Sequence, residues 1–401
     1  MKIIFVNRFY YPDLSATSQL TTDLAEYLVS KGLDVHVVTS RALYNQSSEK
    51  LSANDTHNGV IIHRSYSFSL GRNKIVSRIA EYLLFYVGAI KILTKILNAN
   101  DRLVIETDPP LFSVPASFLS QYKKALQVNW IQDIFPEIVQ VDLHSPLATW
   151  FFGFLKIFRD RSYINSAMNV VLSDSMAENV RPQAIGTDKV KKIDNWSDGK
   201  QIVPIADEHN EVRKKLGLMG KFVVGYSGNM GHMHDFNTLI EAIKYSSQQR
   251  IMYLFIGGGK RKSELQRRLA TETTCDYLFL DSVNRELLSQ YLACIDFHLV
   301  TLLPQFEGLA VPSKFYGVLA AGKPVIYIGS KKSYLAKIIN EYSIGFVVGI
   351  DEYLVLADIL STYTEKSVSY EQMCTASRNL FEHKYSKEIA CEKWFKLLNE
   401  L

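Results

Sequence analysis

Three glycine-rich stretches carry the strongest chemical signal in this sequence. Residues 225–232 (GYSGNMGH) follow one apolar run, and residues 257–259 (GGG) follow another and precede Lys260, Arg261 and Lys262. Glycines at the end of a strand let the backbone approach a phosphate, and basic side chains nearby neutralise its charge. Each stretch alone is explained nearly as well by a tight turn. Together with residues 306–328 they favour a nucleoside-diphosphate site at one edge of a sheet.

Residues 306–328 (FEGLAVPSKFYGVLAAGKPVIYI) form the third stretch. Pro312 and Ser313 predict a turn that leads into a helix over residues 314–321, which Gly322 ends before a strand over residues 325–328. The N-terminus of a helix presents free backbone N–H groups and a positive dipole end, which suit a phosphate. The alternative is an ordinary helix–strand unit of an α/β sheet.

The sequence lacks the motifs of several other nucleotide and metal sites. None of the stretches has G-x-G-x-x-G followed by an acidic residue about 20 positions on, and none is a Walker P-loop, so dinucleotide and ATP sites are poorly supported. Cys275, Cys294, Cys374 and Cys391 have no C-x-x-C spacing. They predict reduced, mostly buried thiols of a cytoplasmic protein and no zinc site.

The first half of the chain predicts a doubly wound sheet that positions such sites. A strand over residues 3–7, a loop to residue 18, a helix over 19–30 and a strand over 35–39 form its opening unit. Ligands of these sheets bind at the carboxyl ends of the strands, so residues 12–18 are expected to line a cleft. Further strands are predicted at residues 60–63, 103–107, 126–132, 169–172 and 190–193.

A second α/β pattern begins after a polar segment over residues 196–210, which predicts a linker. Strands are expected at residues 222–227, 251–256, 277–280, 297–301 and 325–328, and helices at 235–245, 260–271, 286–293 and 313–321. The resulting architecture is two Rossmann-like domains facing each other across a cleft. We expect an N-terminal domain over residues 1–198, a C-terminal domain over 199–386 and an amphipathic C-terminal helix over 387–401, which must dock and is expected to return to the N-terminal domain.

Charge and hydropathy limit the partners. The 401 residues carry a formal net charge of +4. Residues 1–198 contain 21 basic and 19 acidic side chains, so each half carries +2, which argues against a nucleic-acid-binding arm. No signal peptide pattern opens the chain, and no uncharged apolar run reaches the ~18 residues of a spanning helix. We therefore expect a soluble, cytoplasmic protein or one attached peripherally to the inner face of the plasma membrane.

Two aromatic segments with basic neighbours are candidates for such attachment. Residues 79–97 (IAEYLLFYVGAIKILTKIL) are apolar nearly all round, and residues 150–161 (WFFGFLKIFRDR) carry five aromatic and three basic side chains. Segments of this kind rest on membranes with their apolar faces in the acyl boundary and their cations on lipid phosphates. Each segment alone is explained as well by a core helix, whereas the pair favours membrane contact.

The order and spacing of short motifs resemble those of bacterial glycosyltransferases of family 4. These are retaining GT-B enzymes of lipopolysaccharide, capsule and exopolysaccharide assembly, and the resemblance covers nearly the whole chain. It rests on residues 10–20 (YYPDLSATSQL), 132–137 (QDIFPE), 195–198 (NWSD), 226–231 (YSGNMG), 255–259 (FIGGG), 312–314 (PSK) and 320–324 (AAGKP).

The resemblance implies a transferase that moves a sugar from a nucleoside-diphosphate donor, UDP-linked, to a growing glycan, with no metal or cofactor required. The glycan is expected to be lipid-linked if residues 79–97 and 150–161 contact a membrane. The second domain is expected to hold the donor and the first the acceptor. Protonated His232 and His234, with Lys314, are expected to stabilise the departing diphosphate. The expected donor contacts are Ser15, Ala16, Thr17, Gly228, Asn229, Gly231, His234, Gly257, Gly258, Val283, Glu307, Leu309, Ala310, Val311, Pro312 and Ser313.

Acidic residues of the first domain are expected to meet the acceptor. Asp133 is assigned to orienting the sugar or acceptor, because the donor phosphate is usually drawn as taking the acceptor proton; a general-base role is the weaker option. Glu137 and Asp13 are expected acceptor contacts. A carboxylate that caps a helix is an equally good explanation for Asp133, and Gln132 replaces a histidine that many family members carry there.

The largest departure from the family pattern is the loss of two glutamates. Leu309 and Gly317 stand where many relatives have them, and Glu307 is the nearby carboxylate. This shifts donor binding toward backbone groups of residues 308–311 and indicates a subgroup with a Pro-Ser-Lys motif. Two alternatives stay open: an enzyme like UDP-N-acetylglucosamine 2-epimerase on the same fold, which needs more carboxylates and histidines than this sequence offers, and a non-catalytic sugar-nucleotide binding subunit.

Overall fold

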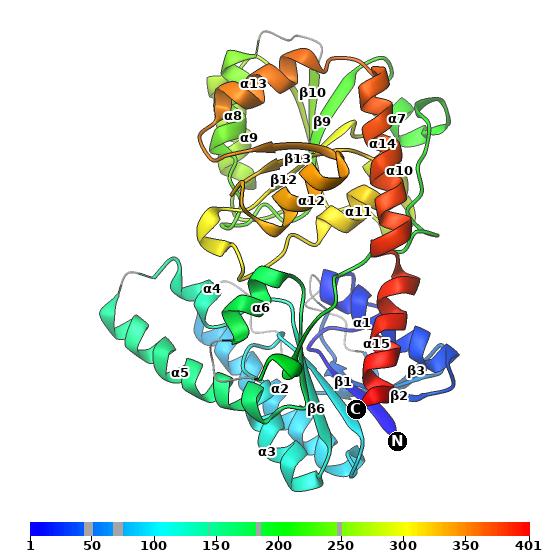
Figure 1. Ribbon diagram of the computed structural model, residues 1–401, viewed down its shortest axis with the longest axis vertical. Helices are drawn as coiled ribbons and strands as arrows, with labels where there is room; N and C mark the ends of the chain where they lie inside the picture. The colour runs from blue at the N-terminus through cyan, green and yellow to red at the C-terminus, as the bar shows by residue number, and fades with distance from the viewer. Residues whose placement is uncertain (44–50, 67–74, 144, 182–185, 247–250) are drawn as a thin grey trace. The chain divides into compact units, whose positions relative to one another are not determined.

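The computed structural model describes residues 1–43, 51–66, 75–143, 145–181, 186–246 and 251–401, and contacts divide the chain into two compact units. Unit 1 comprises Met1–Asp194, Gly308–Val311 and Ala390–Leu401. Unit 2 comprises Asn195–Glu307 and Pro312–Ile389. Each unit is an α/β fold with helices on both faces of a sheet (Figure 1).

Unit 1 contains a sheet in the order β3-β4-β2-β1-β5-β6-β7-β8. All neighbouring strands are parallel except β3, which pairs antiparallel with β4. The strands are β1 (Lys2–Val6), β2 (Asp34–Ser40), β3 (Asn54–His57), β4 (Val60–Ser65), β5 (Arg102–Glu106), β6 (Leu126–Ile131), β7 (Met168–Val171) and β8 (Val190–Lys192). The central strands are apolar runs because both of their faces are covered.

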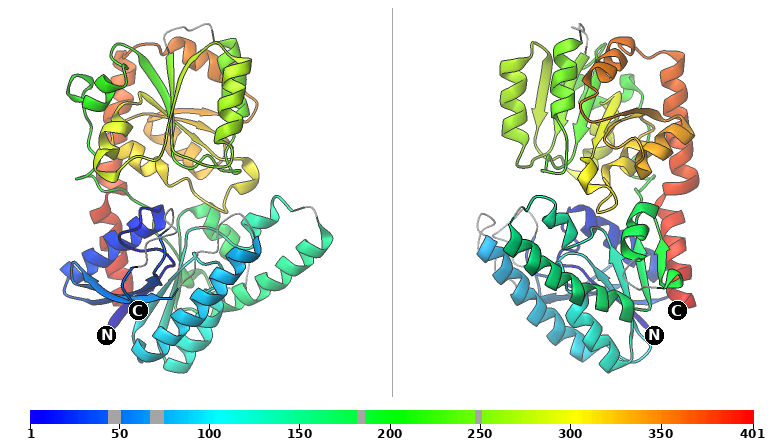
Figure 2. Two further views of the ribbon diagram at one scale, coloured as in Figure 1. Left: turned by 180° about the vertical axis from the view of Figure 1, so that it is seen from behind. Right: turned by 60° about the vertical axis from the view of Figure 1, so that its left-hand side comes forward.

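Helices α2 (Ile75–Ile96), α3 (Ser113–Lys123) and α5 (Pro146–Asn165) lie side by side on one face of this sheet, as Figure 2 shows. Phe85, Ala89 and Leu93 of α2 recur at helical spacing and pack on Ile4 and Ile105 of the sheet. The remaining helices between the strands are α1 (Ala16–Ser30), α4 (Glu137–Gln140), α6 (Asp174–Val180) and a 3-10 turn (Thr187–Lys189).

The C-terminal helix α15 (Lys387–Glu400) docks on unit 1 through its last turns. The ring of Trp394 lies 4.8 Å from that of Trp130 in β6, measured between ring centroids. Tyr27 of α1 donates a hydrogen bond to Glu392 (2.7 Å). The return of this helix to the N-terminal domain agrees with the predicted fold class, and burial of the Trp394 indole explains why its amphipathic pattern needed a partner.

Unit 2 contains a parallel sheet in the order β11-β10-β9-β12-β13-β14. Its strands are β9 (Phe222–Ser227), β10 (Ile251–Ile256), β11 (Asp276–Leu280), β12 (Phe297–Thr301), β13 (Val325–Ile328) and β14 (Gly345–Val348). Its helices are α7 (Glu211–Lys215), α8 (Asn237–Tyr245), α9 (Lys262–Glu272), α10 (Leu288–Ala293), α11 (Lys314–Ala320), α12 (Tyr334–Tyr342), α13 (Tyr353–Thr362) and α14 (Val368–Leu380). Shorter turns are Asp207–His209, Arg285–Leu287, Pro304–Phe306 and the π-helix Phe381–Tyr385.

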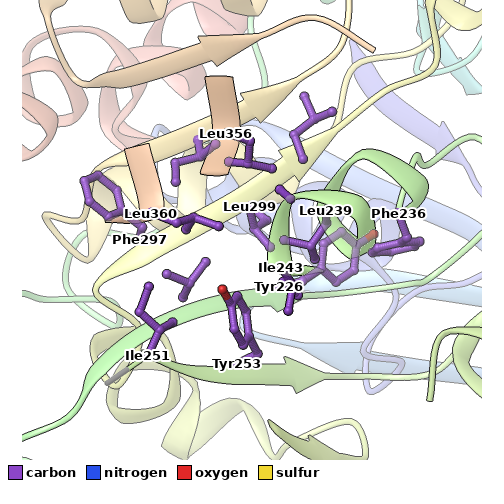
Figure 3. Close-up of a cluster of buried hydrophobic side chains, with 14 of the residues drawn as sticks. Tyr226, Phe236, Leu239, Ile243, Ile251, Tyr253, Phe297, Leu299, Leu356 and Leu360 are labelled. Atoms are coloured by element: carbon purple, nitrogen blue, oxygen red, sulfur yellow. The ribbon is translucent and has the colours of Figure 1, made fainter. Parts of the chain in front are cut away.

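An aromatic and aliphatic core fills one side of this second sheet (Figure 3). Leu239 and Ile243 of α8 and Leu356 and Leu360 of α13 are four residues apart, so each pair points one helix face at the strands. Tyr226, at the end of β9, is buried within this core. The core therefore holds the carboxyl end of β9, from which a glycine-rich loop departs.

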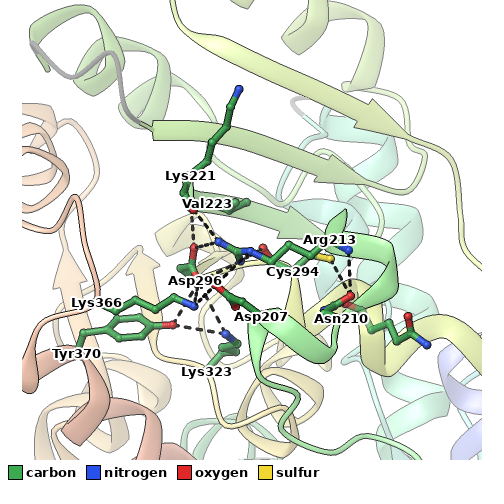
Figure 4. Close-up of polar contacts among 11 residues, drawn as sticks. Asp207, Asn210, Arg213, Lys221, Val223, Cys294, Asp296, Lys323, Lys366 and Tyr370 are labelled. Carbon is green, nitrogen blue, oxygen red and sulfur yellow. Dashed lines mark hydrogen bonds and ion pairs between the residues drawn. The ribbon is translucent and has the colours of Figure 1, made fainter. Parts of the chain in front are cut away.

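A buried ionic cluster lies at the amino end of β12 (Figure 4). Asp296 is fully buried and accepts hydrogen bonds from Arg213 (3.2 and 3.0 Å) and from the backbone N–H of Val223 (2.8 Å). Lys366 and Lys323 lie 3.3 and 3.8 Å from its carboxylate. One carboxylate thus ties α7, β9, β12 and the chain around α14 together at the edge opposite the glycine loops.

The sequence predicted the central strands closely and several other elements not at all. Strands β9, β10, β12 and β13 have the predicted bounds, whereas β3, β14, α3, α12, α13 and α14 were not predicted. The four cysteines are free, as expected. Within the described residues, no helix has the length and hydropathy needed to cross a membrane.

Candidate functional site

Two glycine loops of unit 2 pack backbone on backbone at the carboxyl ends of β9 and β10. The N–H of Gly228 donates to the carbonyl of Ile256 (2.8 Å), and the N–H of Met230 donates to that of Gly258 (2.7 Å). Gly257 has φ +123°, and a Cβ there would collide with the carbonyl oxygen of Gly228. Side chains are excluded from this junction, so the expected donor residues Gly228, Gly257 and Gly258 meet at one place.

Lys314 lies beside these loops with an ammonium group that has no hydrogen-bond partner among the described residues. Its Nζ lies 3.3 Å from the centroid of the Tyr226 ring, a cation–π contact. A Cβ on Gly228 would lie 3.5 Å from this Nζ, so glycine at this position keeps one further side chain out of contact with the amine. The stem of Lys314 is partly exposed, but its Nζ is inaccessible, and burial holds its pKa well below the usual range.

This arrangement makes Lys314 a candidate anion ligand of unit 2. A buried amine without a partner is costly, and a phosphate oxygen within reach would restore both its charge and its hydrogen bonds. Helix α11 is seven residues long, close to the predicted eight, and the dipole of so short a helix is weak. An anion that restores the proton of Lys314 would be held by this side chain more than by the helix.

The two histidines of the glycine loop differ in environment. His232 is exposed, and its ring meets that of Phe306 edge-on at 5.5 Å. His234 is buried, and its Nδ1–H donates to the carbonyl of Thr301 (2.7 Å). Burial, with the nearby charge of Lys314, lowers the pKa of His234 to about 3. The expected protonated imidazole is therefore wrong for His234, which supports the loop as a neutral donor.

The remaining expected donor contacts of unit 2 lie in different settings. The backbone N–H of Tyr334, at the start of α12, donates to the Glu307 carboxylate (3.2 Å). Val283 is partly buried and packs against an apolar cluster that includes Leu254 and Ile256 of β10. Pro312 is buried and Ser313 is exposed, and both precede Lys314 directly. The Asn229 side chain lies against Gly231, inside the glycine loop.

The segment Gly308–Val311 belongs to unit 1, where it pairs with the Asp133 strand end. The N–H of Ile134 donates to the carbonyl of Leu309 (2.8 Å), and Asp133 forms an antiparallel bridge with Ala310. Leu309 and Val311 pack on the apolar cluster around Ile134. Three residues expected at the donor thus contact the loop expected at the acceptor, a juxtaposition that the sequence did not predict.

Asp133 combines exposure with a strongly shifted titration. More than a third of the residue's surface is accessible. Even so, protein surrounding the carboxyl raises its pKa to about 6, and the negative charge of Asp108 adds to the shift. The accessible surface allows an acceptor hydroxyl to reach the carboxylate, and the raised pKa places its titration in a pH range in which transfer can be followed.

If Asp133 orients the acceptor as a carboxylate, transfer should fall as the pH drops through about 6. We expect Asp133→Asn to lower the rate about 10-fold or more at neutral pH and to abolish this limb of the profile. Folding raises this pKa above its unfolded value, so ionisation destabilises the fold as the pH rises, and the variant should remain folded at neutral pH. The measurement is the rate of nucleotide release against pH.

Asp108→Asn is the matched control for this pH profile. It removes the negative charge that raises the pKa of Asp133, so the limb should move to lower pH without disappearing. Full transfer activity in Asp133→Asn would remove Asp133 from the reaction.

Glu137 is held by cations of α5. Its carboxylate accepts two hydrogen bonds from the Arg159 guanidinium (2.7 and 3.1 Å) and lies 3.1 Å from Lys156. Burial alone would raise the pKa of Glu137, but Arg159 holds it below its usual range. The structure therefore gives this residue an anchoring role, and acceptor contact remains a prediction.

The loop after β1 is fixed by Asp13, whose carboxylate accepts a hydrogen bond from the N–H of Ser15 (2.8 Å). Ser15 caps the start of α1 without a side-chain hydrogen bond, and its hydroxyl is buried without a partner among the described residues. Ala16 is exposed and Thr17 half-buried at the first turn. Asp13 thus shapes the loop itself, and contact with an acceptor or donor stays a prediction.

Sequence reasoning missed a charged cluster at the same edge of unit 1. Arg8 follows β1 and lies 3.4 Å from Asp108, after β5, and 3.8 Å from Glu81 of α2. Its guanidinium stacks 4.8 Å from the Tyr82 ring. The available signal was a charged residue directly after each of two predicted strands, but the three segments are far apart in sequence. Among the described residues no group of three histidines, cysteines or carboxylates could hold a metal ion.

Comparisons with known proteins match this architecture. Residues 208–379 match the family model "Glycosyl transferases group 1". The probable glycosyltransferase WbjE of Pseudomonas aeruginosa is 24% identical over 334 residues, 80% of each chain. The putative colanic acid biosynthesis glycosyl transferase WcaI of Escherichia coli (strain K12) is 24% identical over 345 residues, 80% of this chain and 82% of WcaI. HepE of Anabaena in complex with UDP-glucose has a TM-score of 0.73 at 15% identity, with 100% of both chains covered.

Proposed function

This chain is a glycosyltransferase with a group 1 domain and a GT-B fold, and we propose that it moves a sugar from a UDP-linked donor to a growing cell-surface glycan. The observation that carries the proposal is the buried Nζ of Lys314, which has no hydrogen-bond partner among the described residues and adjoins two backbone-only glycine loops. A diphosphate supplies what such an amine lacks, a dense negative charge with several acceptor oxygens. The UDP-glucose complex of HepE supports uridine as the nucleoside of the donor.

We propose that unit 2 holds the donor and unit 1 the acceptor. In unit 2, the Lys314 ammonium and the backbone of loop 228–231 would bind the diphosphate and stabilise it as it departs, without a metal ion. The N–H groups of Gly228 and Met230 are excluded from this role, because they donate to the carbonyls of Ile256 and Gly258. In unit 1, Asp133 would orient the attacking hydroxyl while the donor phosphate takes its proton. Transfer with retention of the anomeric configuration is part of this proposal. The name of WcaI supports a polysaccharide as the product.

The test of the reaction type is the slow hydrolysis of UDP-glucose that a transferase carries out when water replaces the acceptor. Proton NMR of the released glucose, recorded before the anomers equilibrate, should show the α-anomer first, because the donor is an α-glycoside. First release of the β-anomer would contradict retention. A chain that neither hydrolyses UDP-sugars nor binds UDP would contradict the proposed function altogether.

We also propose that the protein attaches peripherally to the inner face of the plasma membrane through residues 79–97 and 150–161, where it would meet a lipid-linked acceptor. The structure places α2, α3 and α5 in a row, and each exposes large apolar side chains. We define the outer apolar face as these side chains: Ile79, Leu83, Leu84, Val87, Phe118, Tyr122, Leu147, Trp150, Phe151, Phe154, Ile157, Phe158 and Ile164.

Charge favours an anionic bilayer as the partner of this face. Helices α2, α3 and α5 together carry seven basic and two acidic residues, a net charge of +5, whereas the whole chain carries +4. The rest of the chain is therefore slightly negative, and the positive excess lies on these three helices. Two copies of the same face would repel each other, whereas anionic headgroups would attract it.

A further inference from the structure

Helix α5 has two faces with different partners. Its outward residues Leu147, Trp150, Phe154 and Ile157 follow helical spacing, and their exposed fractions are 81, 72, 48 and 64%. The buried residues of α5 are Arg159, Ser162 and Tyr163, all in its last two turns. The earlier turns of α5 therefore bury no side chain completely, and a helix with so little packing is marginal in water.

Three inward residues of α5 meet one short loop. Phe152 packs edge-on against Phe135, with 6.0 Å between ring centroids. Lys156 lies 3.1 Å from Glu137. Arg159, one turn later, donates to the carbonyl of Phe135 (2.9 Å) and to both carboxylate oxygens of Glu137. Positions 152, 156 and 159 share one helix face, so α5 holds this loop along a single stripe.

This loop, residues 134–137, directly follows Asp133, the residue proposed to orient the acceptor. Asp133 precedes Phe135 by two residues and Glu137 by four. On its other side the same loop is paired with Leu309 and Ala310 of unit 1. The position of the Asp133 carboxylate thus depends on two attachments. The one to α5 combines Phe152 and Lys156, in the weakly packed early turns, with Arg159 at the start of the packed last turns.

We propose that a lipid bilayer activates the enzyme through α5, with Arg159 as the positioning residue that transmits the effect to the Asp133 loop. Seating of the outer apolar face in an anionic surface buries the side chains that the protein leaves exposed, which stabilises the early turns. A stabilised α5 holds Phe135 and Glu137 more firmly through the Arg159 fork, and Asp133 is ordered with them. The inference rests on the proposed function for its consequence in transfer, but the structural coupling stands apart from it.

The test compares hydrogen exchange of the amides of Ile138–Val141 with and without vesicles of phosphatidylethanolamine and phosphatidylglycerol. These amides donate within the loop and α4, to the carbonyls of Ile134, Pro136 and Glu137. We expect the vesicles to slow their exchange at least about fivefold in the wild type, the lower end of typical couplings between sites. Vesicles of phosphatidylcholine alone, which lack the negative charge, should have a smaller effect.

Two variants separate binding from transmission. The triple change Trp150→Ser, Phe154→Ser and Ile157→Ser removes exposed side chains and should abolish both vesicle sedimentation and the slowing. Arg159→Lys keeps the positive charge but loses the two-pronged contact with Glu137, so it should sediment with vesicles and show no slowing. Glu137→Gln removes the carboxylate that accepts both hydrogen bonds from Arg159, and it is the substitute variant if Arg159→Lys does not fold.

The outcomes distinguish this inference from the function it rests on. Slowing in Arg159→Lys equal to that in the wild type would overturn the role of Arg159, and wild-type binding without any slowing would overturn the coupling. Concentration-dependent self-association of the wild type, abolished by the triple change, with no sedimentation on anionic vesicles, would show that a second copy covers this face. In UDP-glucose hydrolysis, Arg159→Lys should lower kcat with unchanged affinity for UDP. A wild type that orders its loop on vesicles but hydrolyses no donor would contradict the proposed function alone.

Discussion

Replacement of Lys314 by methionine is expected to weaken UDP binding about 10- to 100-fold, the worth of one charge-assisted hydrogen bond to a buried group. Methionine keeps the unbranched stem and the contact with the Tyr226 ring but removes the ammonium that the diphosphate would meet. Titration calorimetry of UDP into the variant and the wild type measures the difference. Lys221→Met is the control, because Lys221 is exposed and lies just before β9, at the opposite end of that strand.

The same substitution should act in the opposite direction on stability. Burial lowers the pKa of Lys314 from its ordinary value, so the folded state binds this proton less tightly than the unfolded state. The stability of the wild type should therefore rise with pH toward the unfolded pKa of lysine, and Lys314→Met should lose this dependence and melt at a higher temperature at neutral pH. A variant that lost both UDP affinity and stability would indicate a structural role and would contradict the assignment.

Asp296→Ala is expected to be the most destabilising single change in unit 2, at a cost of about 3–5 kcal/mol. The alanine would leave the buried Arg213 guanidinium with Asp207 (3.3 Å) as its carboxylate partner in place of two, and would leave the N–H of Val223 without its acceptor. Lys366 and Lys323 would lose the same charge (Figure 4). Native-state hydrogen exchange of amides in β9 and β12 reports the free energy of opening of this sheet.

Asp276→Ala is the matched control for that experiment. Asp276 pairs with Lys221 at 3.3 Å in the same unit, but both side chains are exposed. Its loss should cost no more than about 1 kcal/mol. Equal effects of the two substitutions would show that the buried cluster of Asp296 contributes no more than a surface ion pair.

The central strands were predictable because parallel strands covered on both faces are apolar runs, as in β9, β10, β12 and β13. Strand β3 (NDTH) was missed because it is a polar, exposed edge strand with no apolar signal. Helix α3 (SVPASFLSQYK) was missed because its serines and internal proline obscure the 3.6-residue pattern. Both failures come from elements whose structure depends on neighbours more than on their own composition.

The candidate site divides in the same way. Gly228, Gly257 and Lys314 were found from local sequence, because a glycine after a strand and a lysine at the start of a helix are short-range signals. The partner of Glu137 is Arg159 in the next helix, and no local pattern links them. Burial lowers the pKa of His234 and so keeps its imidazole neutral, and the sequence of the glycine loop does not predict that this side chain is buried.

The structure shows which side chains of the two aromatic segments are buried and which are exposed. Residues 79–97 and 150–161 were explained by core helices as well as by membrane contact. Helix α2 has a buried face and an exposed face, with Phe85 in the core and Val87 71% exposed, so membrane contact stays a prediction. Helix α5 exposes four of its six aromatic side chains, Trp150, Phe151, Phe154 and Phe158. Vesicle contact itself awaits the sedimentation experiment.

The most direct test of the central claim is a calorimetric titration of the wild-type protein with UDP, GDP, ADP and CMP, first without and then with a divalent metal ion. The account predicts preferential, micromolar binding of UDP that does not depend on the metal, because Lys314 and the glycine loops of unit 2 supply the contacts to the diphosphate. Binding of none of the four nucleotides, or binding of UDP only when the metal is present, would contradict it.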